Sequence, residues 1–141
     1  MRLLMISLSL SEEIGASEAE AEALCRRLRA ALAALPLHRD RFAVELLCRE
    51  ALANAIEHGC RFDPAKRISI ALGMVGDTVV CRVHDEGVGF DFAVLPVDEP
   101  DELRERRNGI RIMKLYSDRC YFEDEGRTLV FERLIDEGSR T

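Results

Sequence analysis

Apolar and polar positions in the first half of the chain predict one strand followed by two helices. Residues 3–10 form a mostly apolar run that predicts a strand. Ser17 stands three residues before Glu20, which is the spacing of a capping box, and the Ala-, Leu- and Arg-rich run that follows predicts a helix to about Leu35. Residues 41–58 predict a second helix.

Breaker and capping residues set the ends of these helices. Pro36 ends the first helix, Asp40 is placed to cap the second, and Gly59 is placed to stop it. The two helices are therefore expected to be separate elements joined by a short turn.

A hairpin follows the second helix. Residues 67–74 and 78–83 contain β-branched side chains and alternate between apolar and polar positions. They flank a turn at Val75-Gly76-Asp77. The segment from Asp85 to Asn108 lacks periodicity and contains two prolines, so it predicts a long loop. Long loops in compact domains usually carry function.

The C-terminal third predicts a short helix and two more strands. The helix runs from Ile110 to about Ser117. The strands cover residues 119–123 and 127–134, with a turn at Glu125-Gly126 between them.

This order of elements lacks the strict alternation of strand and helix found in doubly wound sheets, so it predicts an α+β fold. The expected architecture is a two-layer sandwich, in which a mixed and mostly antiparallel sheet carries helices on one face. Residues 1–141 are expected to form a single domain, without repeats or linkers.

Composition narrows the class of protein. With 48% hydrophobic and 33% charged residues among 141, the chain is expected to fold around a sizeable core. The net charge of -6 argues against a general nucleic-acid binder. Five cysteines without a CxxC pair support neither a disulfide framework nor a zinc module, and they favour the reducing cytoplasm. No stretch is long enough to span a bilayer.

The second predicted helix carries a polar stripe on a mostly apolar surface. At about 100° per residue, Glu50, Asn54, Glu57 and His58 fall on one side. Glu50 and Asn54 are one turn apart, so that a carboxylate and an amide oxygen can face one cavity and hold Mg²⁺ or a positioned water. An ordinary solvent-facing stripe explains the spacing as well. A lone histidine at a helix end is more often structural than catalytic.

Two further groups of residues have the chemistry of a ligand site. Asp85, Gly87 and Gly89 follow a hydrophobic strand, where a carboxylate can accept from an exocyclic amine and glycines let the backbone approach a ligand; the alternative is a simple turn. Asn108-Gly109 is expected to open the short helix, whose free N–H groups suit a phosphate. Residues 104–119 hold six basic side chains against two acidic ones, which suits either an anionic ligand or a solvated face.

These groups, in this order, resemble the GHKL ATPase superfamily, and within it the anti-sigma factor serine kinases. The resemblance covers nearly the whole chain. It rests on segments similar to the family's N box, first glycine box, second glycine box and closing Gly-Thr element, which are residues 50–59, 85–90, 108–118 and 126–128.

The resemblance implies roles for individual residues. Asn54 would coordinate Mg²⁺ that bridges the phosphates of ATP, and Glu50 would act as general base toward a substrate serine. Asp85 would accept from the adenine amine, and Gly87 and Gly89 would let the chain pass close to the base.

The second glycine box contains both a match and a departure. Gly109 would place helix-start amides at the phosphates. In the closing Gly-Thr element, Thr128 would help to hold the adenine contacts of Asp85. Arg107 stands where the family usually has another glycine. Arg107 either serves as a phosphate ligand or reduces nucleotide affinity.

The function that the resemblance implies is an ATP- and Mg²⁺-dependent serine-protein kinase. It would phosphorylate an anti-anti-sigma (STAS-type) partner, bind a sigma factor, and act as a homodimer without nucleic acid or membrane. The alternative is a partner-switching adaptor with weak or absent catalysis, for which Arg107 is the motive. A histidine kinase catalytic domain is a third possibility, although only about 40 residues precede the N-box helix and His38 lies in a turn.

Overall fold

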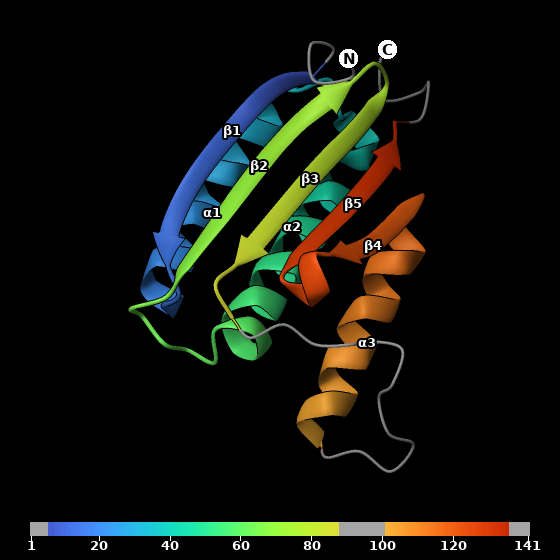
Figure 1. Ribbon diagram of the computed structural model, residues 1–141. Coiled ribbons are helices and arrows are strands. Elements are labelled where there is room, and N and C mark those ends of the chain that lie inside the picture. Colours follow the sequence, from blue (N-terminus) through green and yellow to red (C-terminus); the bar gives the residue numbers. More distant parts are fainter. Residues whose placement is uncertain (1–5, 88–100, 136–141) are drawn as a thin grey trace.

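The computed structural model describes the backbone of residues 6–87 and 101–135, and the side chains of residues 8–87 and 108–135. Its centre is a five-stranded sheet with the order β1-β2-β3-β5-β4 (Figure 1). The four pairings between neighbouring strands are all antiparallel. The strands are β1 (Ile6–Gly15), β2 (Arg67–Val75), β3 (Thr78–Asp85), β4 (Arg119–Glu123) and β5 (Thr128–Leu134).

Helices form the second layer. Both α1 (Glu18–Ala33) and α2 (Arg41–Asn54) lie on the same face of the sheet, behind it in the view of Figure 1. A π-helical turn, η3 (Ala55–Gly59), continues α2. The third helix, α3 (Asp101–Tyr116), packs against α2 beside β4. Short 3-10 turns, η2 (His38–Asp40) and η5 (Asp124–Gly126), join the larger elements. The two-layer α+β prediction is confirmed.

The core fills the space between the two layers. Alternate residues of β2 and β3 point toward the helices, as the period of two in a strand requires. Every third or fourth residue of α1 packs toward these strand residues, and Leu24, Leu28 and Leu32 are at most 1% exposed. Phe131 of β5 is the largest of the fully buried side chains in the described part of the chain.

Several predicted elements are confirmed by their local contacts. The Ser17 side chain accepts a hydrogen bond from the Glu20 backbone N–H at 3.2 Å, so Ser17 caps α1. The β2–β3 hairpin turns at Gly76, whose φ of +59° favours glycine.

Two predicted boundaries are wrong. The first strand continues to Gly15, because the alternation persists beyond the acidic pair Glu12-Glu13 and buries Ile14. The predicted loop is too long, since α3 already begins at Asp101. Its first two turns are charged residues of good helix propensity without apolar periodicity, which is why the pattern missed them.

Asp40 does not cap α2, contrary to the prediction. It stands at the N-cap position with helical backbone angles and makes no side-chain cap bond. Instead, its buried Oδ1 accepts hydrogen bonds from Nε and Nη2 of Arg133, at 3.1 and 2.8 Å. Arg133 also donates to the Tyr116 carbonyl, so one β5 side chain connects the start of α2 to the end of α3.

No helix in the described ranges is long and apolar enough to cross a membrane.

Candidate functional site

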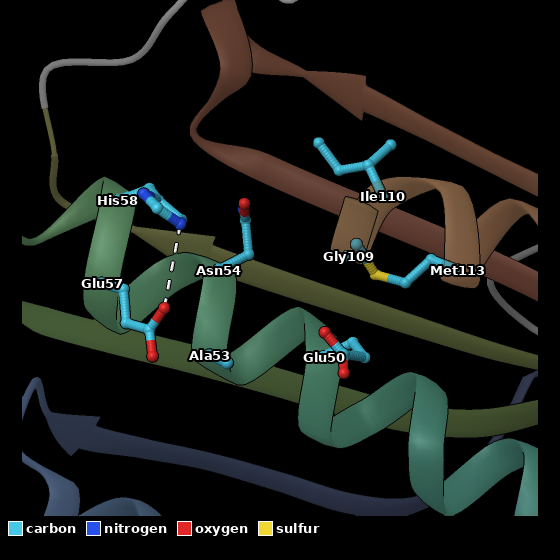
Figure 2. Close-up of a pocket in the computed structure, with 8 residues that line it drawn as sticks. All are labelled: Glu50, Ala53, Asn54, Glu57, His58, Gly109, Ile110 and Met113. Carbon is cyan, nitrogen blue, oxygen red and sulfur yellow. Dashed lines mark ion pairs between the residues drawn. The ribbon is translucent and has the colours of Figure 1, made fainter. Parts of the chain in front are cut away.

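The polar stripe of α2 faces a small cavity between α2 and α3. In Figure 2, Glu50 and Asn54 point from α2 toward α3, where Gly109, Ile110 and Met113 complete the wall. The cavity volume is about 40 Å³, which is room for a water molecule or a single ion. The predicted grouping of Glu50 with Asn54 is therefore found in the fold.

Asn54 contributes an oxygen that lacks a partner. The residue is only 8% exposed, and its Oδ1 makes no hydrogen bond within the described part of the chain. A buried acceptor without a donor costs about 1–3 kcal/mol, so such an atom usually binds a water molecule, an ion or a ligand. An amide oxygen facing a polar cavity fits a hard cation such as Mg²⁺, which prefers oxygen ligands and keeps several waters.

Glu50 lies one turn before Asn54, in an environment that disfavours its charge. Burial raises the pKa of its carboxyl group, and the nearby carboxylate of Glu57 raises it further. A carboxylate with a raised pKa is a better proton acceptor. A methyl group on Gly109 would lie 3.1 Å from Glu50 Oε2, so α3 approaches Glu50 closely because this position is glycine.

His58 and Cys60 close the same end of the helix. The side chain of His58 is 7% exposed, and its Nε2 lies 3.8 Å from Glu57 Oε2, as the dashed line in Figure 2 marks. Cys60 is buried, and burial raises the pKa of its thiol, which keeps it protonated. This supports a structural role for Cys60.

A second cluster forms where β3 ends. The buried carboxylate of Asp85 accepts a hydrogen bond from the Gly87 backbone N–H at 2.8 Å. A Cβ on Gly87 would lie 2.1 Å from the Gly59 carbonyl oxygen, and a Cβ on Gly59 would lie 2.5 Å from Asp85 Oδ2. Two glycines are thus required for η3, Asp85 and the segment after β3 to meet.

Gly59 and Arg127 are site residues that sequence reasoning missed. From the sequence, Gly59 is a helix stop and the last residue of the N-box segment, without a contact of its own in the site. Arg127 Nε donates to the Gly87 carbonyl at 2.9 Å, so the start of β5 holds the segment after β3. The pairing of β3 with β5 brings Arg127 there, and nothing in its local sequence signals it.

Thr128 does not support Asp85 as expected. Its Oγ1 lies 2.8 Å from Nδ1 of His84. His84 precedes Asp85 in β3, so their side chains point to opposite faces of the sheet, and Asp85 faces the helices. Thr128 therefore belongs to the other face of the sheet.

Gly109 does not open a helix. It lies in the interior of α3, so its backbone N–H is not one of the free amides of a helix start. The prediction that Gly109 opens a helix is wrong, whereas the position of Gly109 near the phosphates of ATP stays a prediction. Arg107 lies on α3, but its side chain is outside the described residues, as is Gly89 altogether.

Comparison with protein families gives an assignment. The family model of the histidine kinase-like ATPase domain matches residues 14–133, so the chain belongs to this family. Comparison with curated proteins gives no match. GHKL ATPase domains bind ATP, usually with Mg²⁺, and the polar face of α2 and the Asp85 cluster lie within the matched range. The GHKL assignment is thereby confirmed, and an ATP-binding function is supported.

Proposed function

We propose that the protein is an anti-sigma factor serine-protein kinase that transfers phosphate from ATP to an anti-anti-sigma partner and also binds a sigma factor. The observation that carries this proposal is the cavity where Glu50, a carboxylate with a raised pKa, lies one turn from the unpartnered oxygen of Asn54. A base beside a cation ligand is what hydroxyl phosphorylation requires.

Each residue has a separate task. Asn54 Oδ1 would hold Mg²⁺, which would supply charge neutralisation at the phosphates of bound ATP. Glu50 accepts the proton of the serine hydroxyl group. The serine oxygen then bonds to the γ-phosphorus of ATP while the bond from this phosphorus to the leaving ADP oxygen breaks. The buried carboxylate of Asp85 accepts a hydrogen bond from the adenine amine. Gly87 keeps the backbone close to Asp85, and Arg127 holds Gly87 in place.

The partners follow from the family resemblance. We propose a STAS-type anti-anti-sigma protein as phosphate acceptor, a sigma factor as the alternative partner, and a cytoplasmic homodimer as the working form. The proposal includes no direct contact with nucleic acid or membrane.

Phosphate transfer to a purified STAS-type acceptor tests the proposal. Replacement of Glu50 by Gln keeps the shape and removes the base, so we expect the transfer rate to fall by about 10²-fold or more while ATP still binds. Glu45→Gln is the matched control, because Glu45 lies on the same helix but pairs with Arg29 away from the cavity. Equal transfer by Glu50→Gln and Glu45→Gln would contradict the proposed base.

A catalytically weak partner-switching adaptor is the second candidate. The observation that favours it is Arg107, which stands where the family usually has a glycine and would reduce nucleotide affinity. Partner binding that is independent of nucleotide and survives both Glu50→Ala and Asn54→Ala would favour the adaptor.

A further inference from the structure

A groove of about 440 Å³ lies on the other side of α2, between α1 and α2. It is about ten times the volume of the α2–α3 cavity, and it is large enough to receive several side chains of a partner. Its lining residues come from α1, α2, η3 and the segment just after η3, and none of these described residues belongs to the sheet.

The groove is continuous with the candidate site. Glu50, Ala53 and Glu57 line both the groove and the α2–α3 cavity. These residues follow the i, i+3, i+7 spacing of one helix face, so they form the ridge that separates the two hollows. Ala53 makes the ridge low, because its side chain is a single methyl group. A hydroxyl group presented from the groove can therefore reach the Glu50 carboxylate.

The rim of the groove is acidic. Glu18 and Glu22 of α1 face Glu50 and Glu57 across it. Arg49 is the basic residue of the lining, and its Nε lies 3.5 Å from Glu45. Neither Glu18 nor Glu22 forms a salt bridge with any residue that the structure describes. The rim therefore attracts positive charge and repels phosphates.

The floor of the groove is apolar. Cys25, Leu52 and Ile56 contribute to it, and Phe62 at its end is 50% exposed. An exposed aromatic ring beside small apolar side chains suits an aliphatic or aromatic group of a partner. The groove thus combines an apolar floor with acidic walls.

We infer that the α1–α2 groove binds the polypeptide segment that carries the phosphate-accepting hydroxyl, and that this segment has basic side chains for the rim and an apolar side chain for the floor. The inference rests on the proposed function, since it defines the substrate class of that site.

Titration of the ¹⁵N-labelled full chain with synthetic peptides tests the inference. The probe is a ten-residue peptide in which arginine and leucine flank a central serine, and its counterpart carries glutamate in place of arginine. We expect the basic peptide to shift the amide signals of residues 18–25 and 49–57, and the acidic peptide to shift none of them.

A matched pair of charge reversals makes the test specific. Glu22→Lys reverses one rim charge and should raise the Kd of the basic peptide about fivefold to tenfold at low salt. Glu13→Lys makes the same change in net charge on β1, outside the groove, and should change the Kd less than about twofold. Equal effects of the two reversals, or equal binding of both peptides, would overturn the inference.

The proposed kinase activity and the groove can fail separately. Binding of the basic peptide in the groove without any ATP binding would overturn the kinase proposal and retain the groove as a docking surface. Phosphate transfer to serine peptides without preference for basic neighbours would retain the kinase and overturn the groove.

Discussion

Glycine has opposite consequences at two positions of the site. At Gly87 a methyl group would meet the Gly59 carbonyl, a backbone atom that cannot move aside. At Gly109 a methyl group would meet, among the described residues, the end of the flexible Glu50 side chain at 3.1 Å. The first glycine is required by the fold, and the second leaves space beside Glu50.

Gly109→Ala is expected to stabilise the protein and weaken its function. Alanine inside α3 has the better helix propensity, so the free energy of unfolding should rise by up to about 1 kcal/mol. The added methyl group intrudes on the cavity beside Glu50, so ATP affinity should fall several-fold. Urea denaturation and calorimetric titration with ATP measure the two effects.

Gly87→Ala is the control for that substitution. Its Cβ would lie 2.1 Å from a backbone oxygen, so it should destabilise the protein by about 1–3 kcal/mol. Loss of stability in Gly109→Ala as large as in Gly87→Ala would contradict the distinction between the two glycines.

The raised pKa of Glu50 predicts a stability that depends on pH. The folded state binds the proton of the Glu50 carboxyl group more tightly than the unfolded chain does. The resulting contribution to the free energy of unfolding is therefore fully present below the pKa of an ordinary glutamate, and it is lost as the pH rises through the raised pKa of Glu50 in the folded state. At pH 7 the ionised carboxylate therefore destabilises the fold.

Glu50→Gln should then raise the free energy of unfolding at pH 7, by less than about 1 kcal/mol because solvent screens the half-buried group. The gain should shrink toward pH 4. Glu45→Gln should change the free energy of unfolding in the opposite direction. A hydrogen bond from Arg29 lowers the pKa of Glu45, so loss of the Glu45 carboxylate should destabilise the protein at pH 7. Urea denaturation at pH 7 and pH 4 shows whether Glu50→Gln and Glu45→Gln change the free energy of unfolding in opposite directions.

Among the elements, β5 connects the two helices that flank the site. Arg133 binds the buried Asp40 at the start of α2 and the carbonyl of Tyr116 at the end of α3. Arg133→Met leaves a buried carboxylate without its arginine, so we expect a loss of about 3 kcal/mol of stability.

Arg119→Met is the matched comparison. Arg119 of β4 pairs with Glu132 at 3.5 Å and is mostly exposed, so its replacement should cost less than about 1 kcal/mol. Thermal denaturation ranks the two variants, and similar losses would show that Asp40 does not depend on Arg133.

Most elements could be predicted because their signals are local. The β2–β3 hairpin has alternating apolar residues around Gly76, and α1 has a capping serine. The first turns of α3 gave no such signal, because their residues are charged and lack an apolar stripe. Asp40 is a residue type that often caps helices, but Arg133 of β5, which lies 93 residues further along the chain, is a stronger partner for its carboxylate.

In the molecule as a whole, the grouping of Glu50 with Asn54 could be predicted from the sequence, because it depends only on the spacing of residues along one helix. The contacts of Gly109 with Glu50, Gly59 with Asp85, and Arg127 with Gly87 depend on tertiary packing. Sequence could name Asp85 and Gly87 by their order after a strand. It could not show that Thr128 belongs to the opposite face of the sheet, because that depends on the register of β5.

The proposed role of Asn54 is to bind, through Oδ1, the cation that accompanies ATP. Asn54→Ala removes a buried oxygen that lacks a partner in the described part of the chain, so the variant should remain as stable as the wild type. Ser69→Ala, at an exposed position of β2, is the control.

Calorimetric titration with ATP, with and without Mg²⁺, is the most direct measurement. We predict that Mg²⁺ strengthens ATP binding at least about tenfold, or about 1.4 kcal/mol, in the wild type and in Ser69→Ala but not in Asn54→Ala. ATP binding that Mg²⁺ strengthens equally in all three proteins, or no ATP binding by the wild type, would contradict the account.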